Sequence, residues 1–167
     1  GSIGVDYSHR HDADVIHDLN TFPYPFKNNS VDEVYLDNVL EHLDNPMRVM
    51  EEVYRITKSG ALVKVVAPYF RSVWAFIDPT HQNFYTVDSF SYFDPRHPIC
   101  KRYDYTLARF NVERIIFNET LFTTLYVILC NHVIYKKGVI IKHIFRIFIL
   151  FFIYCIKCNK ILDKNMC

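Results

Sequence analysis

The 167-residue chain is long enough for one domain with a sizeable core, and a composition that is 50% hydrophobic and 16% aromatic excludes intrinsic disorder. The net charge of +1 points to no polyanionic partner. Residues 1–60 nevertheless carry 11 acidic against 5 basic side chains, whereas residues 135–167 carry 7 basic against 1 acidic. This basic, apolar tail is either a solvated face of a terminal helix or a contact with phosphate groups or a membrane surface.

Three short apolar runs in the first 40 residues predict strands, and each run ends in an aspartate. They cover residues 3–6, 13–18 and 31–37. Pro23 and Pro25 lie between the second run and the third, and they argue against a helix or a central strand there. The first 40 residues therefore predict successive acid-ended strands.

A helix is predicted next, capped by Asp44 or Asn45 and ending at Lys58-Ser59-Gly60. Residues 61–67 are almost uninterruptedly apolar, as in a strand buried on both faces. Strands that alternate with helices predict an α/β fold with a largely parallel sheet. Residues 69–100 are irregular and aromatic, as active-site insertions often are. Further β-type runs follow at residues 114–117 and 125–129.

The end of the chain contains ten uncharged residues, 147–156. A membrane-spanning helix needs about 20, so we expect a core helix here, with an interfacial helix as the alternative. The chain then divides into an α/β domain, residues 1–135, and a basic, apolar helical segment, residues 136–167.

Five cysteines, an odd number, and no signal peptide at the start indicate a reducing compartment. We therefore expect a cytoplasmic protein, peripheral to the membrane if the basic tail binds there. Cys155 and Cys158 form a CxxC pair, but no second pair lies at a spacing that suits zinc. We therefore expect no metal site.

Asp6, at the end of its short strand, suits a carboxylate that grips the two hydroxyls of a ribose. A nucleotide-cradling loop needs glycines between a strand and a helix, and the four glycines are Gly1, Gly4, Gly60 and Gly138. Gly1 and Gly4 precede Asp6 on the same strand and cannot form that loop. Either the fold is of another kind, or the chain begins after the loop.

Several segments together resemble class I S-adenosylmethionine-dependent methyltransferases. They are Gly4-Val5-Asp6, residues 13–20, residues 22–26, residues 30–43 with Val39-Leu40-Glu41-His42-Leu43, and Lys58-Ser59-Gly60. Asp78-Pro79-Thr80-His81 is similar to one uncharacterised bacterial and archaeal subgroup. The resemblance implies a Rossmann-like α/β fold with a mostly parallel sheet, truncated at the N-terminus so that the first strand and helix are missing.

The resemblance also implies which residues bind the S-adenosylmethionine cofactor. Asp6 would bind the ribose hydroxyls, with Tyr7 beside the adenine. Asp18 and Leu19 would meet the edge and face of the adenine. Asn38 and Val39 would lie along the cofactor near its methionine part.

Methyl transfer mainly requires alignment of the acceptor with the methyl group, and an oxygen or nitrogen acceptor can also need a general base. His42 and His81 are the catalytic candidates, because histidine titrates near neutrality; the alternative is a structural hydrogen bond for each. Glu41 is interpreted as an acid at a helix start. One group of aromatic residues could either floor an acceptor pocket or belong to the core. These residues are Tyr69, Phe70, Trp74, Phe76, Phe84 and Tyr85.

The sequence thus predicts methyl transfer from S-adenosylmethionine to a small-molecule or glycan-type acceptor, with no nucleic-acid partner and a peripheral membrane contact only through the C-terminal segment. The alternative is a catalytically inactive methyltransferase-like module for interaction or membrane association. A nicotinamide-dependent oxidoreductase is the third hypothesis. It is favoured least because the segments around His42 and His81 are not expected in that class of enzyme.

Overall fold

The computed structural model describes residues 1–9, 12–118 and 151–158. The strands are β1 (Val5–Asp6), β2 (Val15–Ile16), β3 (Val31–Asp37), β4 (Thr57–Pro68), β5 (Phe110–Asn118) and β6 (Phe151–Cys158). The helices are α1 (Pro46–Ile56), α2 (Trp74–Ile77) and α3 (Pro98–Tyr103), with 3₁₀ turns η1 (Leu40–His42) and η2 (Ser89–Phe93).

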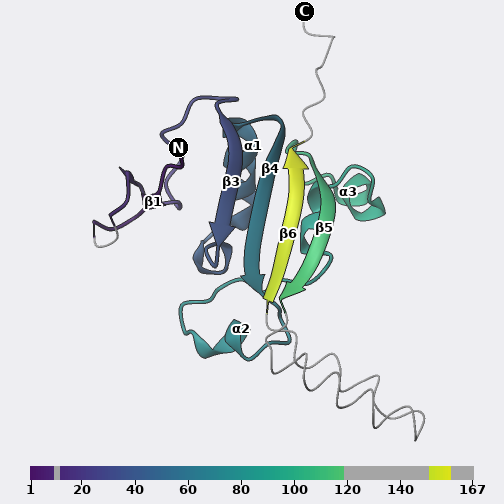
Figure 1. The fold of residues 1–167 in the computed structure, drawn as a ribbon. Helices are drawn as coiled ribbons and strands as arrows, with labels where there is room; N and C mark the ends of the chain where they lie inside the picture. Colours follow the sequence, from purple (N-terminus) through teal and green to yellow (C-terminus); the bar gives the residue numbers. More distant parts are fainter. Residues whose placement is uncertain (10–11, 119–150, 159–167) are drawn as a thin grey trace, which may run out of the picture.

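Four strands form the main sheet, in the order β3-β4-β6-β5 (Figure 1). β3 and β4 are parallel, and β6 is antiparallel to both of its neighbours, so β5 runs in the same direction as β4. β1 and β2 form a separate parallel pair. The predicted α/β fold with a mostly parallel sheet is confirmed.

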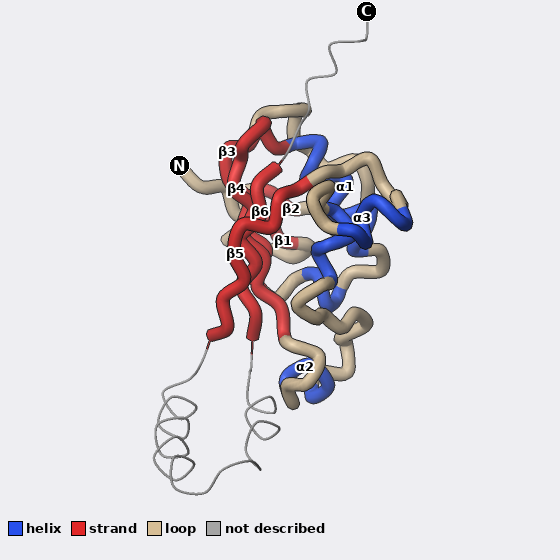
Figure 2. Tube along the Cα trace, turned by 90° about the vertical axis from the view of Figure 1, so that its right-hand side faces the viewer, coloured by secondary structure: helices blue, strands red, loops and turns tan. Residues whose placement is uncertain are grey.

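The described helices lie on one face of the main sheet (Figure 2). Helix α1 buries Val49, Met50, Val53 and Ile56, at the three- and four-residue spacing of one helical face. The sheet contributes residues that alternate along β4, among them Val63 and Val65, and these side chains belong to the same core cluster. Of the two predicted caps, Asn45 caps α1 by accepting a hydrogen bond from the Arg48 backbone N–H. The predicted helix end at Lys58-Ser59-Gly60 is wrong, since α1 ends at Ile56 and these three residues belong to β4.

Residues 151–158 correct the expectation of a C-terminal helix. They form β6, which pairs with β4 on one side and with β5 on the other. A short apolar run suits a buried strand as well as a buried helix, and only the open position between β4 and β5 decides between them. Ile156 and Cys158 are fully buried there. The predicted run at residues 125–129 lies outside the described residues.

No helix within the described ranges is long and apolar enough to cross a membrane.

Glu52 on α1 connects the loop at Tyr24 to this helix. Its Oε2 accepts a hydrogen bond of 2.8 Å from the Tyr24 backbone N–H and one of 2.7 Å from Arg55 Nη2. Arg55 Nη2 in turn donates to the Tyr24 carbonyl, at 3.0 Å. These hydrogen bonds from Arg55 hold the pKa of Glu52 below its usual range, although partial burial acts in the opposite direction. The network fixes the loop that follows β2.

Replacing Glu52 with Gln should therefore lower the free energy of unfolding by about 1.5–3 kcal/mol at pH 7, the usual range for a hydrogen bond to a charged group. Because the folded-state pKa is lowered, this stabilisation is present above the unfolded-state pKa of about 4.3 and is lost as the pH falls through the folded-state value. Urea unfolding at pH 7 and at pH 3 measures both effects. Glu51→Gln on the same helix is the matched control; an equal loss in the two variants would contradict the assigned role of Glu52.

Candidate functional site

The chain turns sharply at Asn38, directly after β3. Asn38 has a φ of 50°, in the left-handed region that asparagine tolerates better than most residues. Its backbone N–H donates to the Val66 carbonyl of β4 at 3.0 Å, and its Nδ2 donates to Asp37 Oδ1 at 2.9 Å. These contacts direct the chain from the sheet edge into η1.

Glu41 is buried by its neighbours in the 3₁₀ turn. Leu40 and Leu43 anchor the turn in the core, and of the two residues between them Glu41 is 0% exposed whereas His42 is half-buried. Neither carboxylate oxygen of Glu41 has a hydrogen-bond partner among the described residues. Burial raises the pKa of this carboxyl group. The sequence pattern alone indicates for Glu41 an acid at a helix start and no role in the site, because its burial depends on the packing of both leucines.

Residues 82–85 are hydrogen-bonded to the backbone carbonyls of η1 and of the residue that follows it. Gln82 N–H donates to the Glu41 carbonyl at 2.7 Å, and Asn83 Nδ2 donates to the Leu43 carbonyl at 2.6 Å. The Tyr85 hydroxyl donates to the Leu40 carbonyl at 3.0 Å. These bonds satisfy the carbonyls of a short turn and hold a segment from the insertion, some forty residues further along the chain, against it.

This attachment brings His81 against His42, with ring centroids 4.6 Å apart and planes at 68°. His81 Nδ1 lies 3.2 Å from the Ala75 carbonyl, which can only accept, so Nδ1 is the donor. His42 Nδ1 lies 2.9 Å from Thr80 Oγ1, whose own proton goes to Asp78 Oδ1 at 2.6 Å. His42 Nδ1 is therefore also a donor. In each neutral imidazole, Nε2 carries the lone pair.

The hydrogen bonds from Thr80 hold the pKa of Asp78 below its usual range. Asp78 therefore stays an acceptor for Thr80 at neutral pH, and this fixes the direction of the chain of hydrogen bonds that ends at His42.

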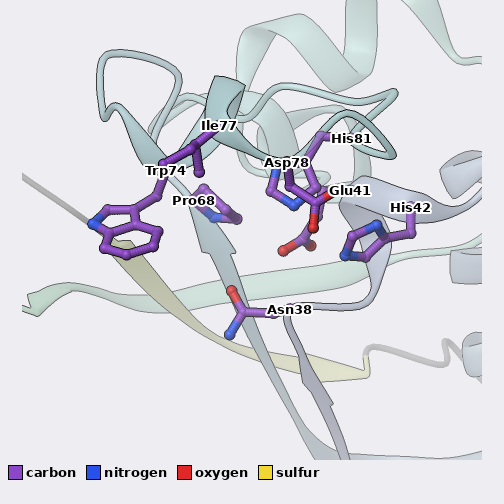
Figure 3. A pocket seen from close by; sticks show the side chains of 8 residues that line it. All are labelled: Asn38, Glu41, His42, Pro68, Trp74, Ile77, Asp78 and His81. Atoms are coloured by element: carbon purple, nitrogen blue, oxygen red, sulfur yellow. The ribbon is translucent and has the colours of Figure 1, made fainter.

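A pocket of about 260 Å³ opens onto this group. The polar side chains Glu41, His42, His81 and Asp78 gather on one side, and the Trp74 indole lies on the opposite side (Figure 3). The remaining lining residues are Asn38, Pro68 and Ile77. Ligand atoms of Glu41, His42 and His81 all lie within 4.8 Å of one another, close enough for a single metal ion to bridge. The pocket can thus hold a small group between an apolar wall and two proton acceptors.

The two predicted catalytic histidines thus share one pocket, and so does Asn38. Val39 instead packs against the core.

The other predicted cofactor residues lie at the ends of β1 and β2 or directly after them. The parallel register aligns Asp6 with Ile16, so Asp18 follows at the same edge. Asp6 Oδ1 accepts from Ser8 N–H, and Asp18 Oδ1 accepts from Asn20 N–H. Tyr7 is 78% exposed, whereas Leu19 packs against the core.

Of the six aromatic residues of the insertion, Tyr69 and Tyr85 belong with the core, Trp74 lines the pocket, and the three phenylalanines do neither. Tyr85 is buried, and Tyr69 packs against the core. Trp74 lines the pocket and is 46% exposed. Phe76 and Phe84 stack on each other with centroids 4.8 Å apart, and both are exposed. Phe70 is also exposed and meets the edge of the Tyr69 ring.

Residues 3–65 match the family model of the methyltransferase domain. A search of curated protein sequences gave no match. Among solved structures, the chain is similar to a SAM-dependent methyltransferase from Archaeoglobus fulgidus, with a TM-score of 0.55 and 16% identity over 93% of this chain and 75% of that one. It is also similar to an S-adenosylmethionine-dependent methyltransferase from Mesorhizobium loti, with a TM-score of 0.54 and 10% identity over 93% of this chain and 79% of that one.

At such low identities the solved structures establish the fold, and the family model adds the match over the first strands and α1. The segment matched by the family model includes Asp6, Asp18, Asn38 and the 3₁₀ turn with Glu41 and His42. Residues 3–65 thus match a methyltransferase domain, and the chain has the fold of the S-adenosylmethionine-dependent methyltransferases to which it is similar.

Proposed function

We propose that this protein is an S-adenosylmethionine-dependent methyltransferase, and that its acceptor is a small-molecule or glycan-type compound whose hydroxyl group enters the pocket at His42 and His81. The observation that carries the proposal is the convergence of two imidazoles in one pocket, beside Asn38 at the end of β3. The pocket volume of about 260 Å³ suits a small group, since whole drug-sized ligands occupy roughly 300–1,000 Å³.

The residues that would hold S-adenosylmethionine are those at the ends of the first three strands. Asp6 is half-buried, and Ser8 N–H fixes the orientation of its carboxylate, which fits a charged acceptor for two ribose hydroxyls. Asp18 is exposed at the same edge and can meet the adenine. Asn38 lines the pocket and would place the methionine part of the cofactor beside the histidines.

S-adenosylmethionine supplies a methyl group that is already activated on a sulfonium, so the protein has to align the acceptor and remove a proton. His42 and His81 each direct Nδ1 at an acceptor, and each therefore has an Nε2 lone pair for that proton. Trp74 and Ile77 form an apolar wall that can hold the body of the acceptor and exclude water.

Asp6→Ala should weaken the binding of S-adenosylmethionine about 10- to 100-fold, which corresponds to the loss of a charge-assisted contact of about 1.5–3 kcal/mol. Calorimetric titration of the folded protein measures this change. Asp12→Ala, which removes the same charge from an exposed position, is the matched control. Absence of saturable binding to the folded wild-type chain would contradict the proposal and would favour the inactive interaction module.

His81→Gln should reduce the turnover number about 10²- to 10⁴-fold, the usual contribution of a positioned general base, with unchanged affinity for S-adenosylmethionine. The assay is release of S-adenosylhomocysteine with a panel of hydroxylated small molecules and sugars. His9→Gln changes an exposed histidine and serves as the control. Equal rates in wild type, His42→Gln and His81→Gln would remove both histidines from the reaction.

A further inference from the structure

The burial of Glu41 is electrostatically unfavourable, and the proposed methyl transfer gives this carboxylate no role. In the part of the chain that the structure describes, its two carboxylate oxygens are the buried side-chain oxygens without a hydrogen-bond partner. A buried carboxylate without a partner is strongly unfavourable unless it takes up a proton or meets a cation. A cation at this position would have to lie on the pocket side, where Glu41 contributes to the lining.

His42 and His81 line the same pocket as Glu41 and are the two further candidate ligands. The Nδ1 atoms of His42 and His81 are engaged by Thr80 Oγ1 and by the Ala75 carbonyl, so both Nε2 lone pairs remain for another partner. An imidazole that donates one ring N–H to an oxygen while the other nitrogen binds an ion is the common arrangement at metal centres. The ligand atoms of Glu41, His42 and His81 lie within 4.8 Å of one another, a spacing that one ion can span.

We propose that Glu41, His42 and His81 bind a divalent transition-metal ion, with remaining coordination positions open toward the pocket. Two neutral imidazoles and one carboxylate are borderline-soft ligands that suit Zn²⁺, Co²⁺, Mn²⁺ or Fe²⁺. Mg²⁺ prefers oxygen ligands and holds its water tightly, so the site should discriminate against it.

The outer shell of the site is also in place. Asp78 and Thr80 orient the His42 ring through two successive hydrogen bonds of 2.6 and 2.9 Å. The Glu41 carbonyl accepts from the N–H groups of Gln82 and Asn83, which hold the residues next to His81 against the turn. The three ligands therefore have fixed positions before an ion arrives, and this lowers the entropic cost of binding it.

This step rests on the proposed function. With an ion bound, both Nε2 lone pairs would be engaged, so the ion would replace the two histidines as the group that activates the acceptor hydroxyl. An acceptor hydroxyl bound at an open position would lose its proton more readily, because a divalent ion lowers the pKa of a bound oxygen. Its proton passes to water, the oxygen forms a bond to the methyl carbon, and the carbon–sulfur bond breaks with its electron pair on the sulfur of S-adenosylhomocysteine.

Titration of the tag-free chain with Co²⁺ under reducing conditions, followed by visible absorption, tests the site. We expect one equivalent to bind with the weak d–d bands of nitrogen and oxygen ligation, and Zn²⁺ to displace it. Glu41→Gln and His81→Ala should each weaken binding by more than about 100-fold, beyond the roughly 10- to 100-fold typical of outer-shell changes. Thr80→Val removes only the orienting hydroxyl and should fall within that outer-shell range.

His9→Ala controls for binding to an exposed imidazole. Glu41→Gln also separates metal binding from folding, because removal of a buried charge should leave the metal-free protein at least as stable, while the Zn²⁺-induced rise in its unfolding temperature disappears. Thiolate-to-cobalt charge-transfer bands would overturn the proposal, since Cys100 and Cys158 are free thiols. No binding, preferential binding of Mg²⁺, or binding that survives Glu41→Gln and His81→Ala would overturn it as well.

The proposed metal site and the proposed function can each be overturned without the other. Bound Co²⁺ without turnover of any acceptor would support the site and count against the proposed hydroxyl acceptor. Methyl transfer by a chain that binds no Co²⁺ and is insensitive to chelators would support the proposed function and overturn the site.

Discussion

The attachment of residues 82–85 to η1 is the constraint on which the pocket depends. A short 3₁₀ turn leaves carbonyl groups without partners inside its own backbone, and here the side chains of Asn83 and Tyr85 and the backbone of Gln82 satisfy them. The same bonds bring the His81 ring to 4.6 Å from the His42 ring, although the two residues are far apart in sequence. Without this attachment, neither the pocket nor the group around Glu41 would exist.

The burial of Glu41 shows how stability and function are opposed at this site. Leu40 and Leu43 bury their side chains favourably, and because Glu41 lies between them on a short turn, its carboxylate enters the interior with them. A glutamine or an aliphatic residue would be more stable in that position. A buried charge without a partner is an unfavourable feature of the kind expected at functional sites, where the surrounding structure offsets its cost.

The sheet supplies the rigid frame for this arrangement. β3 delivers Asn38 and the 3₁₀ turn, and β4 holds the turn through the bond from Asn38 N–H to the Val66 carbonyl. β6 lies antiparallel between β4 and β5, so the described C-terminal strand completes the sheet on the far side of β4 from the site. Because the strands of the sheet hold one another and the 3₁₀ turn in place, a loop residue such as His81 can occupy a defined position.

Local patterns in the sequence were sufficient to predict β3, β4, the start of α1 at one of two caps, and the α/β fold, because periodicity and capping depend on neighbours along the chain. His42 and His81 were predicted singly as candidates, since histidine in a strand-end turn and in an insertion suggests chemistry. Cysteine pairs are the local metal-binding pattern to look for, and their spacing predicts no metal site. The ligands proposed here are separated by about forty residues, so no local pattern reveals them.

Only the tertiary structure decided that residues 151–158 form a strand, that Glu41 is buried, and that His42 and His81 meet. Each of these results depends on contacts between segments distant in sequence: the open place between β4 and β5, the packing of Leu40 and Leu43, and the hydrogen bonds from residues 82–85. A local sequence pattern does not reveal such contacts, because they are determined by the free energy of burying and pairing groups that lie far apart in the sequence.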